Sequence, residues 1–150
     1  MDRRERPGGD TVVVGVDGHA SGRVAVQWAV EEARRRRLRL HLVQVVHAGA
    51  SAVGVAGAEV LVGEAEAARD SLDQLKHEHG AELEVSSEVL FGSPGQVLVD
   101  VAAEAAMLVV GPRRHGPLGS ALLGSVSTYC THHCACPVVV VARAAHTVQA

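Results

Sequence analysis

The stretch from residue 109 to residue 127, VVGPRRHGPLGSALLGSVS, carries the residues of this sequence best suited to bind an anionic ligand. It ends in Gly124-Ser125-Val126-Ser127, immediately before a segment with helical spacing. The first N–H groups of a helix have no partner within the helix, and its dipole is positive there, so a helix start attracts phosphate. Gly124 permits close approach of a ligand, and the hydroxyls of Ser125 and Ser127 can donate hydrogen bonds. Glycine and serine are also ordinary capping residues, so the stretch alone leaves phosphate binding and capping both open.

A second candidate is the carboxylate of Asp17, which ends the aliphatic run that starts at Thr11. It suits a ribose hydroxyl or a base amine better than a phosphate, although aspartate after a strand is also a common turn former. Gly111 ends a later aliphatic run. Ligands of open parallel sheets bind beyond the carboxyl ends of the strands, where strand order reverses. If these two runs are neighbouring strands at the reversal, one crevice contains both groups.

Cysteine and histidine cluster near the end of the chain, at Cys130, His132, His133, Cys134 and Cys136. On a helix Cys130 and Cys134 share a face. Thiolate and imidazole groups together are ligands that suit zinc, and a cluster of cysteines can also act as a redox-sensing site. Free cysteine also packs as a small apolar side chain. We favour packing of this helix against a sheet, with the two histidines more exposed. A thiol sensor that uses the three cysteines stays open as an alternative.

Composition excludes several classes of protein. The net charge of −3 gives no electrostatic case for nucleic-acid binding. No apolar run is long enough to span a bilayer, and the first ten residues, MDRRERPGGD, lack a secretory signal. With an odd number of cysteines, no disulfide framework is implied, so we expect a reducing cytoplasm.

Motifs for catalysis are also missing from the sequence. It has no GxxxxGK[ST] motif and no GxSxG motif, and its single lysine, Lys76, lies in a segment with helical spacing. No nucleophile and base occur at a recognisable spacing. We therefore assign no catalytic residue.

The elements that position these groups alternate along the chain, which predicts one α/β domain with an open parallel sheet. Aliphatic, β-branched runs indicate strands buried on both faces, with helices covering the sheet. We predict strands at 11–17, 40–47, 81–90, 107–111 and 137–142, and helices from Ser21 to the arginine run 34–37, at 60–79, from Ser93-Pro94 onward, and at 124–133. Residues 48–59 are expected to form a loop, and Gly80 a helix C-cap. The domain spans 11–143, between tails at 1–10 and 144–150.

The segment from Val12 to Arg143 resembles a universal stress protein domain of the ATP-binding type. The matching stretches are VVVGVDGHASGRVAVQWAVEEA, HLVQVVH, GSPGQVLVDVA and LVVGPRRHGPLGSALLGSVSTYCTHHCACPVVVVAR. The family signature G-x2-G-x9-G-[ST] falls on Gly111, position 114 and Gly124-Ser125. The resemblance implies a Rossmann-like sheet of order 3-2-1-4-5, similar to adenine nucleotide alpha hydrolases, with the first and fourth strands side by side.

The resemblance also implies a binding site for ATP, with Mg²⁺, or for a related adenine nucleotide. Asp17 and the backbone around Val45 would hold the adenine and ribose. Gly111 and position 114 would face the ribose and phosphates, and the start of the last helix would present N–H and hydroxyl groups to the phosphates. The full set of site residues is Gly15, Val16, Asp17, Val45, Val110, Gly111, Arg114, Gly124, Ser125, Val126 and Ser127.

Position 114 departs from the family signature, because Arg114 replaces the second glycine. A side chain there costs about 1 kcal/mol if the backbone requires positive φ, yet a guanidinium beside phosphates can add a charge-assisted contact. We expect retained but altered nucleotide binding. The alternative is a partner-binding scaffold of the same fold that has lost the nucleotide through Arg114.

The expected function is that of a regulatory stress-response module whose nucleotide occupancy changes its interaction surface. The resemblance allows at most slow ATP hydrolysis or self-phosphorylation. We expect a homodimer that pairs through the aliphatic edge strand Pro137–Ala142, since an exposed edge strand is an association site unless it is covered.

Overall fold

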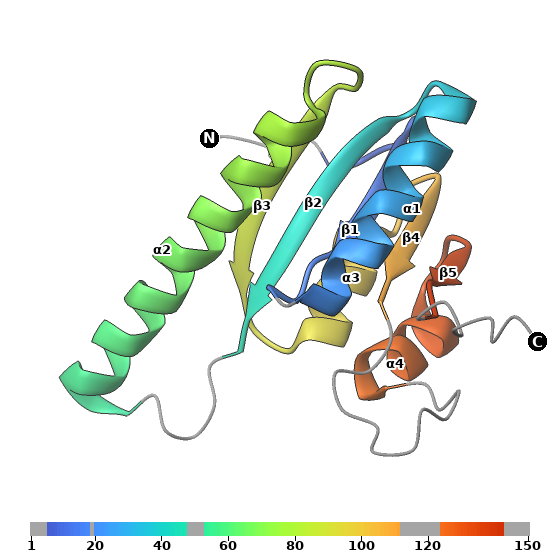
Figure 1. The fold of residues 1–150 in the computed structure, drawn as a ribbon. Coiled ribbons are helices and arrows are strands. Elements are labelled where there is room, and N and C mark those ends of the chain that lie inside the picture. Colours follow the sequence, from blue (N-terminus) through green and yellow to red (C-terminus); the bar gives the residue numbers. More distant parts are fainter. Residues whose placement is uncertain (1–5, 19, 48–52, 112–123, 143–150) are drawn as a thin grey trace, which may run out of the picture.

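The computed structural model describes residues 6–18, 20–47, 53–111 and 124–142. Strands and helices alternate along this part of the chain (Figure 1). The elements are β1 (Thr11–Gly15), α1 (Ala20–Arg36), β2 (Arg39–Val46), α2 (Gly54–His79), β3 (Val85–Phe91), α3 (Pro94–Val101), β4 (Met107–Val110), α4 (Ser125–His133) and β5 (Val138–Val140). Arg114 and the tail 144–150 lie outside the described residues, as do the first residues of the tail 1–10 and part of the loop 48–59.

The strands form a five-stranded parallel sheet of order β3-β2-β1-β4-β5. The order predicted for the family is therefore confirmed. β1 pairs with β2 on one side and with β4 on the other, with Val13 opposite both His41 and Leu108. Strand order reverses between β1 and β4, so the two aliphatic runs that precede Asp17 and Gly111 are neighbours.

Helices cover both faces of the sheet, as the uniformly aliphatic strands require. On one face Val12 and Val14 pack in a core that includes residues of α1 and α2, among them Ala29 and Leu72. On the opposite face Val13 packs in a second core with residues of α3 and α4. Alternate side chains of one strand thus pack in two different cores. The carboxyl end of the sheet lies between the two helix layers.

Several predicted boundaries were wrong, including the end of β1, which lies at Gly15 rather than at residue 17. α2 begins at Gly54, not Val60, because the small residues predicted as a loop are compatible with a helix that starts after extended Val53. β3 begins at Val85 rather than residue 81, since the chain turns at residues 80–83 before it. β5 covers 138–140 instead of 137–142, although backbone bonds from Leu108 to the Pro137 carbonyl and from Val141 to the Val110 carbonyl prolong its ladder.

Gly80 caps α2 as predicted, with its N–H donating to the Lys76 carbonyl at 2.8 Å. Its φ of −69° is right-handed, so this cap does not depend on the freedom of glycine to adopt positive φ. The helix is long enough for its first turns to project beyond the sheet (Figure 1). Val55, Val60 and Val62 are exposed on this part of α2.

Candidate functional site

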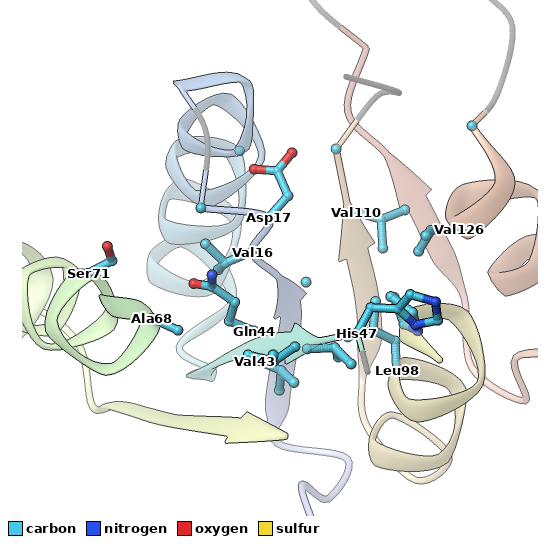
Figure 2. A pocket seen from close by; sticks show the side chains of 18 of the residues that line it. Val16, Asp17, Val43, Gln44, His47, Ala68, Ser71, Leu98, Val110 and Val126 are labelled. Atoms are coloured by element: carbon cyan, nitrogen blue, oxygen red, sulfur yellow. The ribbon is translucent and has the colours of Figure 1, made fainter. Parts of the chain in front are cut away.

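A cavity of about 810 Å³ opens at the carboxyl ends of β1, β2 and β4, between the two helix layers (Figure 2). Its size is that of a typical small-molecule site. Every predicted site residue that the structure describes lines it, namely Gly15, Val16, Asp17, Val45, Val110, Gly111, Gly124, Ser125, Val126 and Ser127. Residues from separate parts of the chain are thus brought together around one space.

The start of α4 forms one wall of the cavity. Gly124 is the N-cap residue, with φ −69° and ψ 170°, and as a glycine it offers the first N–H groups no side-chain cap of its own. The Ser125 hydroxyl is on an exposed residue beside these groups. This wall therefore has the backbone donors and the positive helix end that an anion requires.

Ser127 differs from its predicted role as a hydroxyl donor to a ligand. Its side chain is buried, and its hydroxyl donates a 3.0 Å hydrogen bond to the Gly124 carbonyl. A hydroxyl has one proton, so in this structure Ser127 uses it to secure the first turn of α4, and Ser125 is the exposed serine on this wall.

Asp17 lies on another wall, where β1 passes into α1. Val16 extends the ladder beyond β1 by donating from its N–H to the Val43 carbonyl at 2.8 Å, and the exposed Asp17 follows. A Cβ on Gly22 would lie 2.5 Å from Oδ1 of Asp17, so the carboxylate sits directly against the first turn of α1. Gly18, between them, has φ +78°, a conformation that favours glycine.

Several lining residues were missed by the sequence analysis. α2 contributes Glu64, Ala67, Ala68 and Ser71, whose spacing places them on one helix face, and β2 contributes Gln44 and His47. The helical spacing was visible in the sequence. Nothing in the sequence, however, shows that this face of α2 borders the carboxyl end of the sheet.

The side chain of His47 also contacts the loop after β3, where its Nδ1 lies 3.2 Å from the Gly92 carbonyl oxygen.

The cysteines lie outside the cavity. Cys130 is fully buried in the core between α3, α4 and the sheet, which confirms its predicted packing role. Burial raises the pKa of the Cys130 thiol to about 11, and burial together with a hydrogen bond to Cys134 raises that of Cys136 to about 12. Both thiols are protonated at neutral pH, and thiols are poor nucleophiles and metal ligands in that form.

Within the described residues, no group of three or more His, Cys, Asp or Glu side chains is arranged to hold a metal ion. The helices of the same part of the chain are too short or too polar to cross a membrane.

Comparison with known proteins agrees with the fold. The model of the universal stress protein family matches residues 9–142, which include every strand and helix described above. The chain belongs to the universal stress protein family. A universal stress protein of Mycolicibacterium smegmatis is 36% identical over 140 residues, covering 87% of this chain and 47% of that protein. This domain therefore spans about half the length of the curated relatives it matches.

Solved structures of universal stress proteins have the same architecture. UspA of Lactobacillus plantarum has a TM-score of 0.80 and 25% identity, over 89% of this chain and 98% of that one. A universal stress protein in complex with cAMP has a TM-score of 0.63 and 25% identity, over 90% and 98% of the two chains. One from Archaeoglobus fulgidus in complex with dAMP has a TM-score of 0.65 and 22% identity, over 87% and 96%.

Proposed function

We propose that the cavity of this universal stress protein binds an adenine nucleotide, ATP or a relative of it, and that occupancy acts as a signal in a stress-response module. One observation carries the proposal: residues from the ends of β1, β2 and β4 and from the start of α4 converge on a single cavity large enough for a nucleotide. The universal stress proteins solved in complex with cAMP and dAMP support an adenine nucleotide as the ligand class.

The chemistry of the cavity walls determines which end of the nucleotide lies where. The first N–H groups of α4, with Ser125, form the anion-binding wall and receive the phosphates. Asp17 would repel phosphates but can accept hydrogen bonds from ribose hydroxyls or a base amine. The base and ribose therefore lie toward Asp17 and Val45, and Mg²⁺ accompanies the phosphates when the ligand is ATP.

We further propose that the protein is a homodimer joined through β5, an edge strand of the sheet. The raised pKa values of Cys130 and Cys136 argue against fast thiol sensing as the main function.

Calorimetric titration with ATP, with and without Mg²⁺, tests the proposed ligand. We expect saturable binding by the unaltered protein. Asp17→Asn removes a charge-assisted hydrogen bond, of about 1.5–3 kcal/mol, and so weakens binding by roughly ten- to a hundredfold. Asp73→Asn is the matched control, because Asp73 is exposed on α2 and does not line the cavity.

Absence of saturable binding at millimolar ATP would contradict the proposal. Recovery of binding in Arg114→Gly would then favour the partner-binding scaffold that has lost the nucleotide through Arg114. Native mass spectrometry of the purified protein adds an independent observation, since it detects both a co-purifying nucleotide and the number of subunits.

A further inference from the structure

The described residues that line the cavity supply little positive charge for a site that is to hold phosphates. Among its lining residues within the described part of the chain, the side chains that ionise are Asp17, Glu64 and His47. Two of these are carboxylates. A nucleotide brings at least one further negative charge, and among these described lining side chains only the imidazole of His47 becomes positively charged when it takes up a proton.

His47 is held in a defined orientation. It directly follows β2, and its Nδ1 lies 3.2 Å from the carbonyl oxygen of Gly92. A carbonyl oxygen only accepts hydrogen bonds, so Nδ1 carries a hydrogen and donates it. The other nitrogen, Nε2, is then an acceptor in the neutral ring and a donor in the protonated ring. Gly92 has φ +140°, a conformation that an L-residue rarely adopts, so this anchor depends on glycine.

The ring lies on the phosphate side of the cavity. Figure 2 shows His47 with Leu98 and Val126 on one side, while Asp17, Gln44 and Ser71 lie on the other. Val126 belongs to the first turn of α4, the wall that we assign to the phosphates.

We propose that His47 is a proton-dependent phosphate contact, so that this universal stress protein binds its nucleotide more tightly at acidic than at alkaline pH. The inference rests on the proposed nucleotide-binding function. Among the described lining residues, the charged groups that share the cavity with His47 are Asp17, after β1, and Glu64 of α2. The described lining residues from α3 and α4 are Pro94, Leu98 and Gly124–Ser127, none of which changes charge between pH 5 and 8.

The direction of the effect follows from linkage. A protonated imidazole beside a phosphate strengthens binding, and binding must therefore draw a proton onto the ring. The terminal phosphate of ATP also titrates in this pH range. cAMP, a phosphodiester, keeps a constant charge, so cAMP is the cleaner probe and ATP the second one.

The experiment measures affinity for cAMP and ATP at pH 5.5, 6.5 and 8.0 at low ionic strength. For cAMP we expect the unaltered protein to bind about three- to tenfold more tightly at pH 5.5 than at pH 8.0, which corresponds to a partly exposed ion pair. His47→Asn keeps an amide donor for the Gly92 carbonyl but no charge, and removes this gain. His47→Lys carries a fixed charge and binds equally at all three pH values. His77→Asn is the matched control, because His77 is exposed in the last turn of α2 and does not line the cavity. We expect its cAMP affinity to depend on pH as that of the unaltered protein does.

Proton uptake gives a second readout that does not depend on any variant folding. Calorimetry of cAMP binding at pH 6.5, in buffers of different ionisation enthalpy, should show net uptake by the unaltered protein. Equal pH dependence in His47→Asn and the unaltered protein, or binding without proton uptake, overturns the role of His47 and leaves nucleotide binding intact. Failure of the unaltered protein to bind either nucleotide overturns both proposals.

Discussion

At the residue scale, Gly22 controls the space available to the carboxylate of Asp17. A Cβ at Gly22 would lie 2.5 Å from Oδ1 of Asp17, so the carboxylate must move when alanine is introduced. Alanine is also a better helix former than glycine by about 0.5–1 kcal/mol. We predict that Gly22→Ala leaves the free energy of unfolding unchanged or slightly raised while weakening ATP binding several-fold. Urea unfolding and ATP titration of the same sample measure the two effects, and unchanged ATP affinity would contradict the prediction.

Cys130 gives a pH-dependent prediction. Its pKa is raised by burial from its ordinary 9.0 to about 11, so the folded protein holds this proton more tightly than the unfolded chain. The resulting stability is fully present below pH 9 and is lost as the pH rises toward 11. Urea midpoints of the unaltered protein should therefore fall more steeply between pH 9 and 11 than those of Cys130→Ala. Parallel midpoints for the two proteins over this range would show that Cys130 does not contribute.

Sequence reasoning located the residues whose chemistry follows from local pattern. Gly111 and Gly124-Ser125 were found because a glycine after a buried strand and a glycine-serine pair before a helix carry their own signal. Gln44 and His47 were missed because each resembles any polar residue near the end of a strand. What makes them part of the site is the packing of β2 between β1 and β3, which local pattern does not encode.

At the scale of elements, α3 packs closely on α4 through a glycine. A Cβ at Gly95 would lie 2.9–3.0 Å from the ring and Cβ of Tyr129, whereas a Cβ at Gly63 on α2 would meet nothing within 4 Å. We predict that Gly95→Ala lowers the free energy of unfolding by about 1–3 kcal/mol through overpacking. Gly63→Ala, the matched control, raises it by about 0.5–1 kcal/mol through helix propensity. Equal urea midpoints for the two variants would contradict this account of the α3–α4 contact.

Element types were easier to predict than element ends. The aliphatic runs and helical spacings identified each strand and helix, and Ser93-Pro94 marked the start of α3, where Pro94 is the first residue. The start of α2 was missed because alanine and glycine carry little periodic signal, so residues 54–59 resembled a loop. The end of β5 depends on where β4 stops offering backbone partners, which is a property of the pair rather than of either strand.

At the scale of the whole molecule, β5 is the edge through which we propose that two copies associate. The Pro137 carbonyl and the Val141 N–H bond to β4, so by the alternation of a parallel ladder the backbone groups of Val138 and Val140 point away from β4. Val140→Pro removes an outward N–H without removing a bond to β4. We predict that this variant is monomeric by analytical ultracentrifugation at concentrations where the unaltered protein is dimeric. A dimeric Val140→Pro protein with unchanged thermal unfolding would exclude pairing through β5.

α4 connects the cavity to β5, the strand through which we propose that two copies associate. Its first turn borders the cavity, and the chain passes from its end through a short turn directly into β5. A helix of 9 residues is about 13 Å long and behaves as a rigid rod. If nucleotide shifts this rod and so strengthens or weakens pairing through β5, thermodynamics requires pairing to change nucleotide affinity by the same factor. Protein concentration then becomes a variable of ligand binding, and a titration repeated at dilutions on either side of the dimer dissociation constant measures the coupling directly.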